Sequence, residues 1–342
     1  MNRINIAVVG CGSITTTRHI PEIINNPNCN LIGVFNKTEK RALDIAEKYG
    51  CISYQSLEAL FNDKKVDAIY VCTSNSSHAD ISIKALNSGK HVLCEKPMAM
   101  SMEECELMLE AAKRNNKQLI IGHDMKLTSV HQAAKKIIKA GELGKVISVR
   151  SSIKHVGPEN WSVNKGNDTW FFNKEKAGFG ALGDIGIHKI DLVRFLLDDE
   201  IVRVCSLNGS LSKKDLQGNP ISIEDNALCL FSTKLGVQGI IEASWCDYGT
   251  PDISTDILCE KGRIKILMDN RYNIIIEHLE GKIEKLAIPN SQYSGVTQDF
   301  IDTILGYKQS PNDGLNACRS LGVVIAAEES AKQGIWIDIK NL

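Results

Sequence analysis

Two patterns of apolar and polar residues divide the chain at about residue 123. Before that point, short apolar runs alternate with amphipathic stretches. The runs that we predict as strands are Ile4–Val9, Leu31–Phe35, Ala68–Cys72, His91–Cys94 and Gln118–Ile121. Nearly continuous apolar strands that alternate with helices are typical of a parallel sheet covered on both faces. Residues 1–123 are therefore predicted to form an α/β domain.

The stretches between these strands have helical periodicity and recognisable ends. The predicted helices span Lys40–Tyr49, Ile81–Ser88 and Met102–Asn115. Gly50 and Gly89 follow the first two as stop signals, because glycine readily adopts the left-handed conformation that ends helices. Ser101 precedes the third helix, with Glu104 three residues later, which is the spacing of a capping box.

After residue 123 the strands are longer and are joined by short turns. The predicted hairpins pair Asn226–Thr233 with Val237–Trp245, Thr255–Glu260 with Arg263–Met268, and Asn273–Leu279 with Lys282–Ile288. The predicted helices are Ser129–Ala140, which ends near Gly141, Gln298–Leu305 and Leu315–Gln333. Turn-linked strands favour antiparallel pairing. Residues 124–342 are therefore predicted to be an α+β domain with a large, mostly antiparallel open sheet.

Composition excludes several classes of function. The chain has 342 residues and a formal net charge of -1, so no global field attracts nucleic acid or an anionic membrane. No apolar run approaches the roughly 20 residues of a membrane span, and the N-terminus lacks the pattern of a secretory signal. None of the 11 cysteines forms a Cys-x-x-Cys pair, so we expect reduced thiols, no metal site and a cytoplasmic location.

A glycine-containing turn follows the first predicted strand. Gly10 and Gly12 permit a tight turn and close approach of the backbone to a pyrophosphate. Ser13 and Ile14 then open a helix, whose first N–H groups and positive dipole end suit an anion. Thr15 stands at the third position of the fingerprint, where glycine or alanine is usual. The strand, turn and helix together predict a dinucleotide site.

The end of the second predicted strand bears on the choice between NAD and NADP. An acidic residue at this point would bind the ribose hydroxyls and select NAD. The chain has Asn36 there, followed by Lys37, with Arg41 nearby as a second cation. Both cations suit a 2′-phosphate, so NADP is slightly favoured. The alternative is that Lys37 and Arg41 are surface charges and that NAD binds through Asn36.

Two segments carry a more specific signal. Val71–His78 (Val-Cys-Thr-Ser-Asn-Ser-Ser-His) is followed by Ala85–Pro97, which ends in Gly-Lys-His-Val-Leu-Cys-Glu-Lys-Pro. This resembles the glucose–fructose oxidoreductase/inositol dehydrogenase family, written Gfo/Idh/MocA, over most of the chain. A surface turn would be the ordinary explanation of Glu-Lys-Pro. Here, however, the segment closes an apolar strand at the edge where open α/β sheets bind ligands.

The resemblance implies a Rossmann domain and assigns roles to particular residues. Lys96 would be catalytic and would contact both cofactor and substrate, and Glu95 would contact the cofactor ribose. Thr73, Asn75 and His78 would lie along the cofactor. Ser74 stands where the family often has proline.

A second signature, Gly178–Asp191, resembles the family's glycine-rich entry to a helix with Asp-x-x-x-His. In a helix, Asp184 and His188 would share a face because they are four residues apart. Phe179 replaces a glycine that is common in relatives. A single histidine on such a helix is more often structural, but its pairing with Asp184 and with Lys96 elsewhere favours catalysis.

These residue types suit the oxidation of a secondary alcohol. His188 titrates near neutrality and is a suitable acceptor for the hydroxyl proton. Lys96 would stabilise developing alkoxide charge, while Asp184 would hold His188 or bind a second hydroxyl. Asp124 and Trp170 are weaker candidates for substrate binding, and Trp245 and Trp336 are expected in the core.

The sequence thus predicts an NAD(P)-dependent oxidoreductase that transfers a hydride to or from a sugar, inositol or similar polyol. Two alternatives remain: a reductase of a different carbonyl or conjugated substrate, and a non-catalytic NAD(P)-sensing regulator. The resemblance also implies a homodimer or homotetramer assembled through the open sheet. Neither nucleic acid nor a membrane is an expected partner.

Overall fold

The computed structural model describes residues 3–289 and 291–339. They form two compact units. The first contains the chain up to His123 and the segment Tyr293–Cys318, and the second contains Asp124–Gln292 and the residues from Arg319 onward. The expected division into residues 1–123 and 124–342 had placed residues 293–318 in the second domain.

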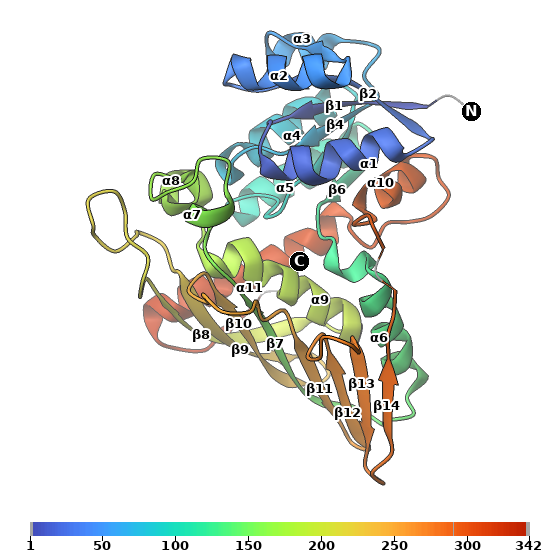
Figure 1. Cartoon of the computed structure of the whole chain (residues 1–342), viewed down its shortest axis with the longest axis vertical. Helices are drawn as coiled ribbons and strands as arrows, with labels where there is room; N and C mark the ends of the chain where they lie inside the picture. The colour runs from blue at the N-terminus through green and yellow to red at the C-terminus, as the bar shows by residue number, and fades with distance from the viewer. Residues whose placement is uncertain (1–2, 290, 340–342) are drawn as a thin grey trace. The chain divides into compact units, whose positions relative to one another are not determined.

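The first unit is built on a parallel sheet of order β3-β2-β1-β4-β5-β6 (Figure 1). Its strands are β1 (Ile4–Val9), β2 (Cys29–Phe35), β3 (Ile52–Ser53), β4 (Ala68–Val71), β5 (His91–Cys94) and β6 (Leu119–Ile121). All four residues of β4 are buried, as expected for a central strand covered on both faces. The predicted apolar runs are confirmed as strands. The two-residue strand β3 had too short an apolar run to be predicted.

Up to His123, the helices of the first unit are η1 (Thr15–His19), α1 (Ile20–Asn25), α2 (Glu39–Tyr49), α3 (Leu57–Asn62), η2 (Asn75–Ser77), α4 (His78–Asn87) and α5 (Met102–Arg114). The three helices whose bounds the sequence predicts are present as α2, α4 and α5, each within three residues of the predicted ends, and the further helices accompany them. Gly50 ends α2 in the left-handed conformation. At α5, the Ser101 hydroxyl accepts the N–H of Glu104 at 3.2 Å, which confirms the predicted cap.

The segment Tyr293–Cys318 packs in the first unit through α10 (Val296–Ile304). Phe300 on α10 is fully buried and meets the Tyr70 ring of β4 edge-on at 5.6 Å. The buried carboxylate of Glu22 on α1 accepts the main-chain N–H groups of Ser294 and Thr297. These contacts join residues that are far apart in the sequence, so a local pattern could not assign α10 to this unit.

The second unit contains a nine-stranded sheet of order β14-β13-β12-β11-β7-β10-β9-β8-β15. The strands are β7 (Val146–Lys154), β8 (Ile201–Gly209), β9 (Asn226–Thr233), β10 (Gln238–Ser244), β11 (Thr255–Cys259), β12 (Gly262–Ile266), β13 (Ile274–His278), β14 (Ile283–Leu286) and β15 (Ile337–Asp338). Pairing is antiparallel except between β10 and β7. The predicted hairpins and the mostly antiparallel sheet are therefore confirmed.

Helices of the second unit gather on one face of this sheet (Figure 1). They are η3 (Met125–Leu127), α6 (Ser129–Ala140), α7 (Pro158–Trp161), η4 (Trp170–Phe172), α8 (Lys174–Ala177), η5 (Leu182–Gly186) and α9 (Ile187–Leu197); α11 (Gly314–Gln333) begins in the first unit. Trp245 is fully buried, as expected. The expectation for Trp336 is wrong: it is 42% exposed, because it lies on the edge of the unit under the Arg203 guanidinium.

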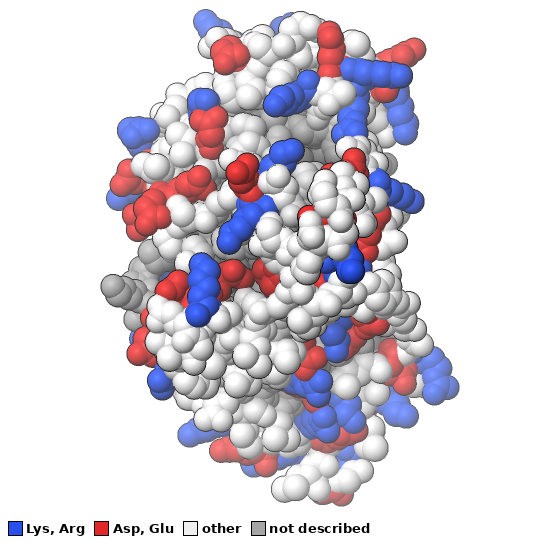
Figure 2. Space-filling view, turned by 90° about the vertical axis from the view of Figure 1, so that its left-hand side faces the viewer, with Lys and Arg blue, Asp and Glu red and all other residues white. Residues whose placement is uncertain are grey.

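The surface carries both signs of charge. Figure 2 shows Lys and Arg side chains interspersed with Asp and Glu over one face of the molecule, which agrees with the net charge of -1. In the described part of the chain, we find no helix with the length and hydropathy that a bilayer crossing requires.

Candidate active site

The candidate residues of the first unit begin with the turn after β1. Gly10 has φ +99°, and a Cβ there would lie 2.3 Å from the carbonyl oxygen of Cys72, so the turn requires glycine. Thr15, at the third fingerprint position, is buried, and its hydroxyl donates to the Gly10 carbonyl at 2.6 Å. Thr15 therefore stabilises the turn from inside. This explains why a residue other than glycine is accommodated there.

The end of β2 is tied to the same turn. The amide oxygen of Asn36 accepts the N–H of Cys11 at 2.9 Å, and its amide nitrogen donates to the Thr38 carbonyl at 3.1 Å. Lys37 is exposed, and Arg41 on α2 is half-buried. The Arg41 charge acts on the Cys11 thiol, although burial dominates and raises the pKa of that thiol to about 12.

The loop after β4 is held by a buried histidine. Nδ1 of His78 lies 2.8 Å from the Pro97 carbonyl, and Nε2 lies 3.2 Å from the Thr73 carbonyl. His78 thus connects the loop after β4 with the loop after β5. Asn75 is buried on η2, and Thr73 is half-buried at the same carboxyl edge. The contact of His78 with the cofactor, which the resemblance implies, stays a prediction.

Glu95 and Lys96 directly follow β5, and the Lys96–Pro97 peptide bond is cis. The Glu95 carboxylate is buried and lies 2.7 Å from Nε2 of His19, which is also buried. Burial alone would raise the pKa of Glu95, but His19, Arg18 and Lys96 together hold it well below its usual range. Glu95 therefore stays ionised at neutral pH, and its second oxygen accepts the Lys96 N–H at 3.1 Å.

These residues fit a dinucleotide. The carboxyl ends of β1, β2, β4 and β5 share one sheet edge, which is where open α/β sheets bind ligands. A Cβ at Gly12 would meet no described atom within 4 Å, so the turn leaves open space above its backbone. Ser13 and Ile14 lead into η1, whose first N–H groups have no partner within the helix. Among the described residues, no three His, Cys, Asp or Glu side chains are grouped for a metal ion.

In the second unit, the candidate residues lie at the glycine-rich entry to η5 and α9. A Cβ at Gly180 would lie 1.8 Å from the Glu224 carbonyl oxygen, so only glycine allows the chain to pass. The buried Glu224 carboxylate accepts the N–H groups of Gly180 and Leu182, both at 3.0 Å. Burial and the nearby Glu328 raise the pKa of Glu224 to about 8. Glu224 therefore caps the helix that carries Asp184 and His188.

Asp184 and His188 meet different partners in this unit. Nδ1 of His188 lies 3.4 Å from Oδ1 of Asp124, and both side chains are largely buried. Oδ2 of Asp184 accepts the indole N–H of Trp245 at 3.3 Å. Residues 182–186 form a wide π-helical turn, so Asp184 lies on an irregular stretch before the regular helix begins. The Asp124 carboxylate, which the sequence predicted only as a substrate contact, thus also lies near the imidazole Nδ1.

Trp170 belongs to an aromatic cluster beside this helix. Its ring stacks on Phe171 at 3.8 Å, and Phe171 meets Trp161 edge-on at 4.9 Å. The next residue, Phe172, is buried and packs against Trp245 at 6.1 Å. The cluster is therefore connected through Trp245 to the Asp184 carboxylate, while Trp170 itself remains partly exposed.

Three buried polar residues of the site were missed by the sequence analysis. They are His19, Glu224 and Lys189, whose Nζ donates to the Ile253 carbonyl at 2.7 Å. His19 lies at the end of η1, 76 residues from Glu95, and Glu224 follows an irregular loop. Neither had a local signal. The one signal for Lys189 was its place beside His188 on an otherwise apolar helix.

Comparison with known proteins gives matches over both units. A family model described as "Oxidoreductase family, NAD-binding Rossmann fold" matches residues 4–123, and the GFO/IDH/MocA C-terminal domain matches residues 131–265. An oxidoreductase of Formosa agariphila is 31% identical over 93% of this chain and 94% of its own length. The 1,5-anhydro-D-fructose reductase of Ensifer adhaerens is 33% identical over 84% of each chain. A solved oxidoreductase domain protein from Kribbella flavida shares the fold, with TM-score 0.88 and 24% identity over 100% of both chains.

Proposed function

Because this chain belongs to the Gfo/Idh/MocA oxidoreductase family, we propose that it transfers a hydride between NAD(P) and a polyol. The reacting group is a secondary alcohol or ketone of a sugar, inositol or similar compound. The observation that carries the proposal is His188, a titratable residue on a glycine-entered helix with a carboxylate at Nδ1. A relative named as an anhydrofructose reductase supports a sugar-like substrate.

In alcohol oxidation, each of these side chains would have a separate role. A carboxylate at Nδ1 favours the tautomer with its proton on Nδ1, which leaves Nε2 of His188 as the base for the hydroxyl proton. Lys96 stabilises the negative charge that develops on the oxygen. The bound nicotinamide supplies the hydride chemistry. Asp184, already held by Trp245, orients a second hydroxyl, and the partly exposed ring of Trp170 packs against the substrate.

For the cofactor, the proposal is NADP in slight preference to NAD. Asn36 brings no negative charge to the end of β2, and its side chain is engaged with Cys11 and Thr38. The exposed Lys37 is a suitable partner for a 2′-phosphate. Gly10, Gly12, Ser13 and Ile14 would hold the pyrophosphate.

For the assembly, the proposal is a homodimer or homotetramer that covers the open sheet. Exposed apolar side chains point away from the helices on alternate positions of the central strands. They are Leu228 and Leu230 on β9 and Leu258 on β11, each 38–45% exposed. Exposed apolar side chains on an open sheet face are typical of an interface. Sedimentation of Leu230→Glu should show smaller particles than the wild type. Unchanged mass would contradict this interface.

The cytoplasm is the proposed location. No disulfide joins the 11 cysteines, all of which lie in the described residues, and most of them are buried. Reduced thiols of this kind are typical of a reducing compartment.

The test of function is a screen of sugars and inositols with NAD and with NADP, read as absorbance of the reduced nicotinamide. On the best substrate, Lys96→Ala should lower kcat by about 100-fold or more, and His188→Asn by about 10²–10⁴. Lys113→Ala, an exposed lysine on α5, is the matched control and should have full activity. Cofactor binding without turnover of any polyol would instead indicate a regulator.

A further inference from the structure

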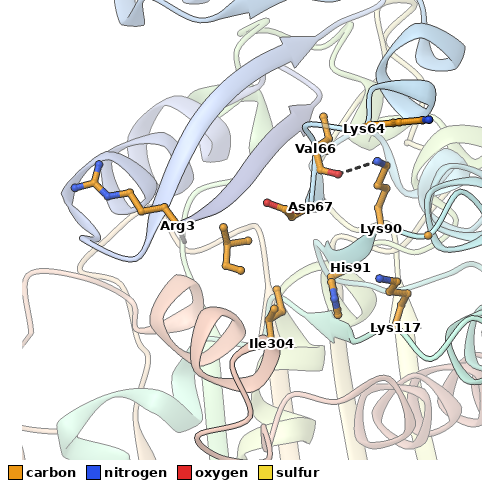
Figure 3. A pocket seen from close by; sticks show the side chains of 10 residues that line it. Arg3, Lys64, Val66, Asp67, Lys90, His91, Lys117 and Ile304 are labelled. Atoms are coloured by element: carbon orange, nitrogen blue, oxygen red, sulfur yellow. Dashed lines mark hydrogen bonds between the residues drawn. The ribbon is translucent and has the colours of Figure 1, made fainter. Parts of the chain in front are cut away.

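A cavity of about 410 Å³ opens at the amino-terminal edge of the parallel sheet (Figure 3). The residues that line it are Arg3, Ile4, Lys64, Val66, Asp67, Gly89, Lys90, His91, Lys117 and Ile304. Ile4 begins β1, and the glycine turn follows the other end of that six-residue strand. A strand of this length spans about 20 Å, so the cavity lies at the edge opposite to the candidate cofactor site.

Cations dominate the lining. Four of the ten described lining residues are lysine or arginine, and Asp67 is the one carboxylate among them. Oδ2 of Asp67 already accepts the main-chain N–H of Asn5 at 2.8 Å. The Arg3 guanidinium donates to the Asn30 side chain, and Figure 3 shows it directed away from the cavity. The lysines therefore determine the local field, which is positive.

Lys90 forms part of the cavity wall, and its side chain is only 7% exposed. Its ammonium donates to the main-chain carbonyls of Asp63 at 2.8 Å and Val66 at 2.7 Å. These acceptors are neutral, so they orient the ammonium without cancelling its charge. An ammonium has three N–H donors, and the two carbonyls engage two of them.

His91, another lining residue, offers its ring Nε2–H as a hydrogen-bond donor. The main-chain N–H of Gln118 donates to Nδ1 at 3.1 Å, so the neutral ring carries its proton on Nε2. Burial, with a contribution from Lys117, lowers the pKa of His91 to about 4, and the ring is therefore neutral at physiological pH. Figure 3 shows the His91 ring and the Lys117 side chain close together.

We propose that this cavity binds a small hydroxylated anion through its phosphate group. Lys117, His91 and Lys90 donate to the phosphate oxygens, and the free oxygen of Asp67 accepts a hydroxyl of the ligand. Ile4 and Ile304 supply an apolar wall. A volume of this size suits a small molecule. Free phosphate and a phosphate monoester share the anionic group, and the experiment distinguishes them.

The test is calorimetric titration with inorganic phosphate, with glycerol 3-phosphate and with neutral glycerol. The protein is first saturated with NAD, because the glycine turn also suits phosphate. We expect saturable binding of one phosphate or monoester per chain. Tighter binding of glycerol 3-phosphate identifies a monoester site, and equal binding identifies a free-phosphate site. No saturable binding, or equal binding of glycerol, would overturn the proposal.

Substitutions of the lining residues test whether the ligand binds in this cavity. Lys117→Met should weaken binding about tenfold or more, since it removes a charge-assisted hydrogen bond. His91→Asn retains an acceptor for the Gln118 N–H and loses only the Nε2 donor, so it should weaken binding severalfold. Lys113→Met, an exposed lysine nearby on α5, is the matched control and should bind like the wild type. Wild-type affinity in Lys117→Met, with an unchanged melting temperature, would exclude this site.

Discussion

Oδ1 of Asp124 lies 3.4 Å from Nδ1 of His188, while Asp184, four residues before His188, binds the indole of Trp245. The two carboxylates thus have distinct surroundings. Asp124 follows the first unit in the chain and comes from a segment 64 residues before His188. A carboxylate at Nδ1 orients an imidazole and stabilises its protonated form.

Asp124→Asn should therefore lower kcat by about 10-fold to 100-fold and move the acidic limb of the pH–rate profile to lower pH. The reason is that removal of the negative charge makes protonation of the imidazole less favourable. The profile is measured by turnover between pH 5 and about 9, the range in which histidine titrates. Asp198→Asn, at the exposed end of α9, is the control. An acidic limb that does not move would assign Asp124 to the substrate alone.

The second prediction concerns the buried pair of His19 and Glu95, which are 2.7 Å apart. His19→Leu should destabilise the protein by about 3–5 kcal/mol, because it leaves a buried carboxylate without its partner. His19→Gln keeps a donor near the position of Nε2 and should cost less. Urea unfolding of both variants at pH 7 gives the free energies.

The same pair predicts how the stability of the protein changes with pH. The pKa of Glu95 is lower in the folded protein than in the unfolded chain, so its contribution to stability is present above the unfolded value and is lost as pH falls. In His19→Leu this loss should begin at higher pH than in the wild type. Parallel acid-unfolding curves for the two proteins would contradict the role of His19.

The third prediction concerns Lys189, which is fully buried and donates to Ile253, Ser254 and Thr255. Burial lowers its pKa to about 7, against an opposing effect of Asp252. The unfolded chain retains the lysine proton up to the ordinary lysine pKa of 10.5. The contribution of Lys189 to the free energy of unfolding should therefore rise with pH between about 7 and 10.5 and be lost as pH falls through 7.

Lys189→Met should remove the rise in the free energy of unfolding with pH that Lys189 causes. Urea unfolding of wild type and variant at several pH values between 6 and about 9.5, within the window set by the two pKa values, measures it. Lys136→Met, at an exposed lysine on α6, serves as the control for loss of a lysine. A difference in stability between wild type and Lys189→Met that stays constant across this range would show that the amine titrates normally.

The fourth prediction concerns Asn36. Asn36→Asp preserves the acceptor for the Cys11 N–H and adds a negative charge at the end of β2. The ratio of the NADP Kd to the NAD Kd should rise about tenfold or more, because the carboxylate repels a 2′-phosphate and binds ribose hydroxyls. Lys37→Ala should raise the same ratio, and the exposed Lys40→Ala should leave it unchanged. Strong NAD preference in the wild type would exclude the 2′-phosphate role of Lys37.

Local pattern was sufficient for most secondary structure. The apolar run Ile4–Val9 has the same bounds as β1, and Ser129–Ala140 is the same helix that the sequence predicts, with Gly141 left-handed at its end. Helix caps, apolar periodicity and turn residues depend on a few neighbouring positions, so they can be recognised in the sequence. The resemblance likewise identified Glu95–Pro97 and Gly178–Asp191, because those motifs are contiguous.

The tertiary structure decided which distant residues meet. It placed α10 in the first unit, put β7 beside β10 in parallel, and brought Asp124 to 3.4 Å from Nδ1 of His188. It also gave Glu95 its partner His19 and gathered lysines from separate loops around one cavity. The sequence alone determined the elements and the motifs within them. These long-range pairings depend on the path of the whole chain and on burial. The periodicity of a short sequence segment contains no information about either.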